Sequence, residues 1–183
     1  MYRFDYLVFI GRFQPFHNAH LETIEIALQH SKNVILVLGS AQIERTPKNP
    51  FLTVERVQMI LTSLSTDNQQ RICFSPIVDV YNDQKWVTQI KQHVEDIVPL
   101  NAKIGLIGHF KDESSYYLKL FPEWEMISLD SLQHDMSATP IREAFYTGKI
   151  ESAMIPEGTE QFLNRFKQTQ SYVKLKASFS EEQ

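Results

Sequence analysis

One stretch of this chain decides the fold that we expect: Ile10-Gly-Arg-Phe-Gln-Pro-Phe-His-Asn-Ala-His20. The apolar run Tyr6–Ile10 that leads into it is typical of a buried strand. After it, apolar residues between Leu21 and Leu28 recur at helical spacing, with acidic residues on the other face. The segment therefore predicts a strand, a turn and a helix in direct succession.

The turn in this segment has the residues of an anion-binding site. Gly11 ends the strand at a point where a side chain would keep a phosphate away from the backbone. If the helix begins near Asn18, His17 and His20 point the same way, because residues three apart share a helix face. The helix N-terminus contributes N–H groups and a positive dipole, and Arg12 adds a fixed positive charge. We therefore expect a negatively charged ligand here.

The composition is that of one ordinary globular domain. The chain has 183 residues, of which 43% are hydrophobic and 22% are charged. Lys and Arg number 18 against 22 Asp and Glu, a net charge of -4 that gives no electrostatic footprint for long nucleic acid. The single cysteine, Cys73, excludes an internal disulfide and a multi-cysteine zinc site. We find no signal peptide and no apolar stretch long enough for a membrane span, so we expect a cytoplasmic protein.

Strand and helix patterns alternate along the rest of the chain. Apolar runs predict four more strands, at 33–39, 71–80, 103–108 and 124–129. Periodic segments predict helices at 53–64, 84–98, 114–121, 137–148 and 159–168. This alternation predicts an α/β fold, a Rossmann-like doubly wound parallel sheet of about five strands with C-terminal helices. Such sheets bind their ligands at the carboxyl ends of the strands.

Several residues predict where helices begin and end. Thr53 is expected to be the N-cap of its helix. Ser137 or Thr139 is expected to cap a later helix, with Pro140 at the first helical position and Gly148 at the end. From residue 171 onward the chain turns polar, which predicts a frayed tail. We therefore assign residues 1–170 to one domain and 171–183 to a polar C-terminal tail.

Two motifs at opposite ends of this domain point to a known group of enzymes. His17-x-x-His20 and Ser137-x-Thr139-x-x-Arg142 resemble the two signatures of the nucleotidylyltransferase superfamily. That superfamily places the second signature at the N-terminus of a late helix. Two motifs in this order, separated by most of a sheet, are far more specific than either alone. The resemblance covers about residues 3–172.

Shorter motifs narrow the resemblance. The chain resembles nicotinamide mononucleotide (NMN) adenylyltransferases of the archaeal type in four places: Gly11-Arg-Phe-Gln-Pro-Phe-His17, Gly39-Ser-Ala-Gln42, Pro50-Phe-x-x-x-Glu-Arg56 and Asp79 with Trp86. The stretch Gly108-His-Phe-Lys-Asp-Glu-Ser-Ser-Tyr-Tyr117 looks more like their bacterial relatives. Many of those relatives carry a Nudix hydrolase domain after the transferase domain, and we expect this chain to lack it.

The resemblance implies an enzyme that joins ATP and NMN into NAD and pyrophosphate. The nucleophile is a phosphate oxygen of NMN, whose second pKa of ~6 makes it largely a dianion at neutral pH, so no general base is needed. Catalysis then consists of positioning and charge stabilisation around the α-phosphate during in-line attack. The resemblance assigns this work to His17, His20, Arg12 and Arg142. Magnesium would be carried by the ATP phosphates, without dedicated protein ligands.

The resemblance also implies the substrate-binding residues. For ATP they are Gly11, Phe13, Gly108, Ser137, Thr139 and Ile141, and for NMN they are Ser40, Arg45, Asp79 and Trp86. Trp86 would stack on the cationic nicotinamide ring, and Asp79 would accept its carboxamide N–H. Because a carboxylate repels the acid form of the mononucleotide, we expect a preference for the amide. Relatives often form homo-oligomers, but we find no feature that fixes a number.

Structural alternatives accompany these roles. Trp86 lies on an apolar stripe and can be a core residue, Asp79 can cap the next turn, and Ser137 and Thr139 can be helix caps alone. Arg56, inside a helix, favours a structural role. The sequence leaves open the roles of Arg45, His109, Lys111 and Asp112.

Three other functions stay open at this point. The chain can transfer a nucleotidyl group to another phosphate, such as that of phosphopantetheine, although Trp86 and Asp79 suit a nicotinamide better. It can be a non-catalytic nucleotide sensor on the same fold, although both signature histidines are present. It can also be a zinc protein that uses the histidine pair, which metal analysis of the purified protein would decide.

Overall fold

The structure, a computed structural model, describes residues 1–42, 44–109, 113–129, 132, 137–148 and 150–181. The chain divides into two compact units. Unit 1 consists of Met1–Gly11, Glu22–Gln42 and Thr66–Gln133, and unit 2 consists of Arg12–Leu21, Ile43–Ser65 and His134–Gln183. Within the described ranges, no helix has both the length and the apolar character that crossing a bilayer requires.

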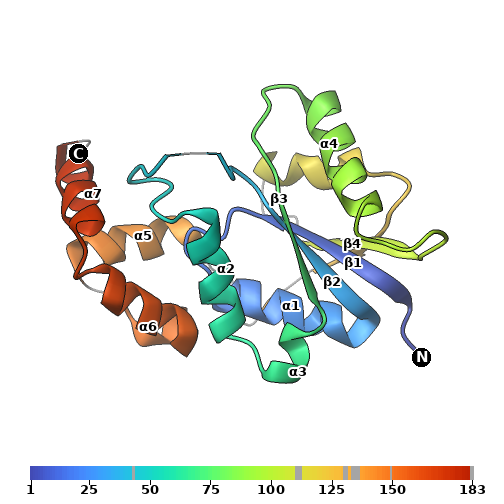
Figure 1. Cartoon of the computed structure of the whole chain (residues 1–183), viewed down its shortest axis with the longest axis horizontal. Helices are drawn as coiled ribbons and strands as arrows, with labels where there is room; N and C mark the ends of the chain where they lie inside the picture. Colours follow the sequence, from blue (N-terminus) through green and yellow to red (C-terminus); the bar gives the residue numbers. More distant parts are fainter. Residues whose placement is uncertain (43, 110–112, 130–131, 133–136, 149, 182–183) are drawn as a thin grey trace. The chain divides into compact units, whose positions relative to one another are not determined.

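The described residues of unit 1 build a parallel sheet of five strands (Figure 1). The strands are β1 (Phe4–Gly11), β2 (Ser31–Leu38), β3 (Ile72–Pro76), β4 (Ile104–Gly108) and β5 (Glu125–Ser128). They lie in the order β3-β2-β1-β4-β5, and every neighbouring pair is parallel. Successive residues of β1, such as Leu7 and Val8, are both fully buried, as expected of a strand covered on two faces. The strand order confirms the predicted doubly wound sheet.

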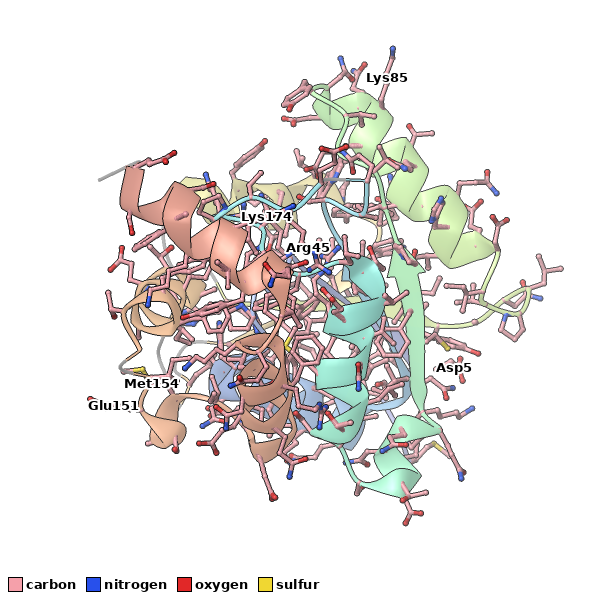
Figure 2. The ribbon with its side chains drawn as sticks, turned by 60° about the vertical axis from the view of Figure 1, so that its left-hand side comes forward. Asp5, Arg45, Lys85, Glu151, Met154 and Lys174 are labelled. Carbon is pink, nitrogen blue, oxygen red and sulfur yellow. The ribbon has the colours of Figure 1, made fainter. Side chains whose placement is uncertain are left out.

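Helices of unit 1 cover both faces of this sheet. They are α1 (Asn18–His30, whose first turn belongs to unit 2), α3 (Thr66–Gln69), α4 (Asp83–Glu95) and the 3₁₀ helix η1 (Glu113–Leu120). Figure 1 shows α4 on one side of the sheet and α1 on the other. The core beneath α4 and η1 joins apolar residues of the strands to those of the helices: Val8, Ile10, Ile35, Val37, Ile90, Val94, Leu106, Leu118 and Phe121. On the opposite face of α4, the exposed Lys85 points away from the sheet (Figure 2).

The carboxyl ends of the strands meet at one edge of the sheet. The amide of Gly39 donates to the carbonyl of Gly11, and the amide of Leu129 donates to the carbonyl of Gly108, both at 3.0 Å. These bonds keep the segments that leave neighbouring strands side by side just beyond the sheet. Ser40 comes directly after this point, so unit 1 carries its candidate residues at the edge where doubly wound sheets bind ligands.

Unit 2 consists of helices packed around an aromatic cluster. The helices are α2 (Thr53–Thr62), α5 (Ala138–Thr147), the short 3₁₀ helix η2 (Ser152–Met154), α6 (Glu157–Phe166) and α7 (Gln170–Glu181). At its centre Phe51 contacts Phe145, Phe162 and Phe166, with ring centroids 5.7, 5.8 and 5.3 Å away. Gly158 lets α6 approach α2 closely, because a Cβ there would lie 2.5 Å from the backbone of Thr62.

The helix ends differ from the sequence predictions in three details. Thr53 is not the N-cap of α2, because the helix is capped one residue earlier, where the Glu55 carboxylate accepts the backbone N–H of Leu52 at 2.8 Å. Ser137 is the N-cap of α5, but its side chain makes no capping hydrogen bond, and Pro140 is the third helical residue rather than the first. Gly148 ends α5 with φ of 81°, as predicted.

The segment predicted to fray forms α7 instead. The Tyr172 hydroxyl donates to the carbonyl of Phe145 at 3.2 Å, and Phe179 stacks on Tyr146 with ring centroids 4.6 Å apart. Leu175 is buried between these two contacts. The three side chains recur at helical spacing, and Tyr172 and Phe179 contact α5, whereas Lys174 and Lys176 between them are exposed.

We expect Leu175→Ala to lower the free energy of unfolding by about 2 kcal/mol, because it removes a buried side chain from a packed helix. Val173→Ala on the same helix is the control, since Val173 is 57% exposed and its truncation opens no cavity. Urea denaturation of both variants measures the difference. Equal stability of the two would show that α7 does not pack in solution.

Candidate active site

The two signature histidines lie in contact at the start of α1. This helix begins at Asn18, as the predicted geometry required. The imidazole rings of His17 and His20 stack with centroids 3.6 Å apart and planes 21° apart. The backbone N–H of His17 donates to Nδ1 of His20 at 3.3 Å. The neutral tautomer that fits this hydrogen bond carries its proton on Nε2.

Aromatic residues of the preceding loop fix the orientation of His20. Phe13 meets the imidazole edge-on at 4.8 Å between centroids, and Phe16 stacks on it at 5.7 Å. Both phenylalanines are buried, and Phe13 holds a positive φ of 52°. Phe13 and Phe16 therefore pack against the imidazole of His20, and the expected role of Phe13 in ATP binding stays a prediction.

The late signature meets the early one within unit 2. Arg142, in the first half of α5, donates through Nη1 to the carbonyl of Gln14 at 2.8 Å and through Nη2 to the hydroxyl of Thr139 at 3.0 Å. Burial and the positive charge of Arg12 lower the pKa of the Arg142 guanidinium. The charges of Arg12 and Arg142 thus repel each other within unit 2. Such a site favours a polyanion.

Two further residues of these signatures differ in exposure. Ile141 is almost fully buried in α5, whereas Ser137 is exposed.

Arg12 has an exposed side chain, and its carbonyl accepts a hydrogen bond from Nη1 of Arg56 at 2.8 Å. The guanidinium of Arg56 also reaches the Thr53 hydroxyl at 3.1 Å, so Arg56 has the structural role that the sequence favoured.

Unit 1 holds a second group of candidate residues at the carboxyl edge of its sheet. The Ser40 hydroxyl donates to one oxygen of the Asp79 carboxylate at 2.6 Å, and the Ser40 amide donates to the other at 3.1 Å. The amide of Asp79 donates to the side chain of Gln42 at 3.1 Å. Ser40 adopts φ of 55°, which turns both of its donors toward the carboxylate. The described contacts therefore assign Ser40 to holding Asp79, a role that the sequence did not predict.

Trp86 and Gly108 pack against neighbouring side chains of unit 1. The Trp86 ring meets Tyr117 and Phe121 edge-on, at centroid distances of 5.9 and 6.0 Å, and is half-buried on the core. A Cβ on Gly108 would lie 2.9 Å from the side chain of Leu118, so a larger residue here would force Leu118 to move. Trp86 thus makes the core contacts that the sequence analysis gave as its structural alternative, and its stacking on nicotinamide stays a prediction.

Other expected residues contribute less to this group. His109 follows β4 and is half-buried. Lys111 and Asp112, whose roles the sequence left open, lie outside the described residues. Among the described residues, no three His, Cys, Asp or Glu side chains are grouped to hold a metal ion, so the zinc alternative finds no third ligand there for the histidine pair.

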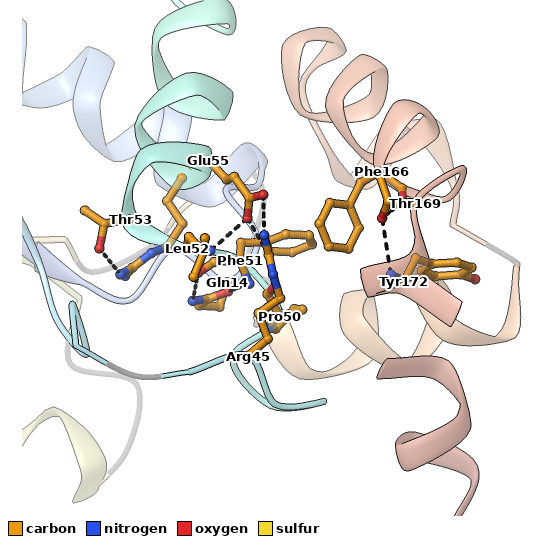
Figure 3. Close-up of polar contacts among 11 residues, drawn as sticks. Gln14, Arg45, Pro50, Phe51, Leu52, Thr53, Glu55, Phe166, Thr169 and Tyr172 are labelled. Atoms are coloured by element: carbon orange, nitrogen blue, oxygen red, sulfur yellow. Dashed lines mark hydrogen bonds and ion pairs between the residues drawn. The ribbon is translucent and has the colours of Figure 1, made fainter. Parts of the chain in front are cut away.

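Arg45 stabilises unit 2, which the sequence did not predict. Its guanidinium forms two bonds to the Glu55 carboxylate, at 2.6 and 2.7 Å, and one to the carbonyl of Pro50 at 2.7 Å (Figure 3). The same group lies over the ring of Phe166, 5.0 Å from its centroid. These contacts give Arg45 a structural role, and its expected contact with the mononucleotide phosphate stays a prediction. Lys48, the other cation of this loop, is exposed.

Comparisons with known proteins agree with the two motifs. A model of the cytidylyltransferase-like family matches residues 8–175. The nicotinamide/nicotinic acid mononucleotide adenylyltransferase of Acinetobacter baylyi is 62% identical over 98% of this chain and 95% of the relative. The nicotinamide-nucleotide adenylyltransferase of Thermococcus onnurineus is 30% identical over 87% of this chain and 82% of the relative.

A solved structure shares the fold. It is a bifunctional NMN adenylyltransferase/ADP ribose pyrophosphatase from Francisella tularensis, complexed with AMP and a manganese ion, with a TM-score of 0.88 and 38% identity. The match covers 97% of this chain and 53% of that protein, so this chain spans about half of its length.

We expect Arg45→Ala to lower the free energy of unfolding by about 2 kcal/mol, because it leaves the Glu55 carboxylate without its partner where the two side chains are 22% and 18% exposed. Arg3→Ala is the matched control: its ion pair with Glu125 has side chains that are 53% and 45% exposed, and solvent screens such pairs. Chemical denaturation measures both. A larger loss for Arg3→Ala would contradict the structural role of Arg45.

Proposed function

This chain belongs to the cytidylyltransferase-like family, and from that premise we propose that it transfers the adenylyl group of ATP to NMN, giving NAD and pyrophosphate. The names of its relatives support the reaction. The observation that carries the proposal is the contact between Arg142 and Gln14, which brings the two signature motifs together around paired cations. A positive site at two helix N-termini suits the triphosphate of ATP.

The proposed chemistry is a direct displacement at the α-phosphate. A phosphate oxygen of NMN forms a bond to the α-phosphorus, while the bond from that phosphorus to the oxygen that bridges to the β-phosphate breaks. Pyrophosphate leaves with the electron pair. Because the NMN phosphate is already largely a dianion, with a second pKa of ~6, the protein does not need to remove a proton. Its task is to bring two anions together and to stabilise the charge that develops on pyrophosphate.

We assign the residues of unit 2 to this task. His20 would donate from Nε2 to the α-phosphate, where negative charge grows in the transition state. His17 and Arg12 would hold the outer phosphates. Thr139 and Arg142, with the N–H groups at the start of α5, would bind the triphosphate from the other side.

Magnesium enters this proposal as part of the ATP substrate. The Francisella tularensis protein is complexed with AMP and a manganese ion, which supports the use of a divalent ion. ATP is available in the cytoplasm, where we propose that the reaction takes place. Whether the chain forms a homo-oligomer stays a prediction.

The residues of unit 1 would recognise NMN. Asp79 is held by Ser40 and has further lone pairs for the carboxamide N–H. Trp86 would present its half-buried ring to the nicotinamide. The relative from Acinetobacter baylyi is named for both the amide and the acid mononucleotide, so the acid form is a second candidate substrate.

We expect His20→Ala to lower kcat for NAD formation about 100-fold or more, because it removes a donor that acts on the transition state. Purified protein is incubated with ATP, magnesium and NMN, and NAD is quantified by chromatography. His30→Ala, at the other end of α1, is the control and should keep its activity. Unchanged turnover in His20→Ala would remove His20 from the mechanism.

We expect Asp79→Asn to raise the ratio of kcat/KM for the acid mononucleotide to that for the amide about tenfold or more, since it removes a like-charge repulsion. Competition between the two substrates in one reaction measures the ratio directly. If the ratio stays constant, Asp79 does not face the pyridine substituent, and its bonds to Ser40 are its whole role.

A further inference from the structure

The loop between β1 and α1 contains one buried polar side chain with an unusual set of partners. Gln14 is 3% exposed. Its side-chain amide donates to the carbonyl of Phe51 at 2.8 Å and accepts the N–H of Phe51 at 3.0 Å (Figure 3). The side chain thus pairs with the backbone of Phe51 through two hydrogen bonds, as a neighbouring strand would. Such buried pairs are specific in geometry, because breaking them leaves polar groups unsatisfied.

Phe51 gives this pair a rigid anchor. Its ring is buried against Phe145, Phe162 and Phe166, and the last of these rings also lies under the guanidinium of Arg45. The backbone of Phe51 is therefore held by the aromatic cluster of unit 2. Through its side chain, Gln14 ties the loop that carries the histidines to this cluster.

The main chain of Gln14 has a different partner. Its carbonyl accepts Nη1 of Arg142 at 2.8 Å. Arg142 is on α5, three residues before Phe145, which itself packs on Phe51. The contacts therefore close a ring, from Gln14 to Phe51, to Phe145, along α5 to Arg142 and back to Gln14. In such a ring, the position of the guanidinium depends on the side chain that fixes the carbonyl it binds.

We propose that Gln14 is a positioning residue for Arg142, an inference that rests on the proposed adenylyl transfer. Its side chain holds the loop, and its carbonyl orients one arm of the guanidinium while the other arm binds Thr139. This bond fixes the guanidinium before ATP arrives, although burial and the charge of Arg12 act against a second cation there. Gln14 acts through Arg142 and does not itself contact the reacting atoms.

A double-mutant cycle on NAD formation tests this proposal. We expect Gln14→Ala to lower kcat about tenfold in otherwise wild-type protein and less than about twofold in Arg142→Lys protein, because both variants act on one contact: Gln14→Ala releases the loop that carries the accepting carbonyl, and Arg142→Lys removes the donating Nη1. In Arg12→Ala protein, the effect of Gln14→Ala should keep its full size. The proposal would be overturned if Gln14→Ala lowered kcat equally in the wild-type and Arg142→Lys backgrounds. It would also be overturned if the Arg12→Ala background reduced the effect of Gln14→Ala as much as the Arg142→Lys background does.

Two further variants separate positioning from stability. Gln14→Met keeps the length of the side chain without its hydrogen bonds, and we expect it to lose kcat as Gln14→Ala does. Ser31→Ala, which removes a buried hydroxyl bonded to the carbonyls of Ala27 and Asn33 at 2.9 and 2.8 Å, should lower the melting temperature without changing kcat. Wild-type kinetics in Gln14→Met would overturn the proposal.

The assay of the wild-type protein distinguishes this inference from the proposed function. Wild-type protein that forms no NAD would remove the proposed function. The same cycle is then measured on the dissociation constant of ATP by titration calorimetry, where Gln14 and Arg142 should again be non-additive. Additive effects on ATP binding, or no binding, would overturn the role of Gln14 as well.

Discussion

The structure of the candidate site depends on two guanidinium groups that are held close together. Arg12 is exposed, whereas Arg142 is half-buried with a lowered pKa, to which the charge of Arg12 contributes. Burial and the charge of Arg12 both disfavour a cation at Arg142, and hydrogen bonds to Gln14 and Thr139 hold its guanidinium in place. A bound polyanion would relieve this repulsion, because its negative charge offsets that of the two cations.

The chain uses its two units for different parts of this task. Unit 1 is a parallel sheet whose carboxyl edge carries Ser40 and Asp79, joined by two hydrogen bonds. Unit 2 carries the two signatures and an aromatic cluster centred on Phe51. The chain passes from one unit to the other between Gly11 and Arg12, directly after the central strand. Recognition of the acceptor and binding of the triphosphate are thus assigned to residues with separate supports.

Much of this account was predictable from short-range patterns in the sequence. The alternating apolar runs gave the strands, and the spacing of His17 and His20 predicted imidazoles on one side of a helix that begins at Asn18. Gly148 ended its helix as expected, because an αL residue at that position favours glycine. The prediction of a frayed tail after residue 170 is wrong, because the structure has α7 there. The few apolar residues of this segment, Leu175 among them, are separated by polar and charged residues that obscure the helical pattern.

Long-range partners were beyond the reach of the sequence. Nothing in the spacing of Gln14 and Phe51, which are 37 residues apart, predicts two hydrogen bonds between them. The sequence leaves the role of Arg45 open because its partner Glu55 lies ten residues away across a loop, a separation without a helical or strand period. The measurement that tests the account most directly is phosphorus NMR of the protein with ATP, magnesium and NMN. The account predicts that NAD and free pyrophosphate appear in equal amounts as ATP and NMN disappear; ADP, or AMP without a dinucleotide, would contradict it.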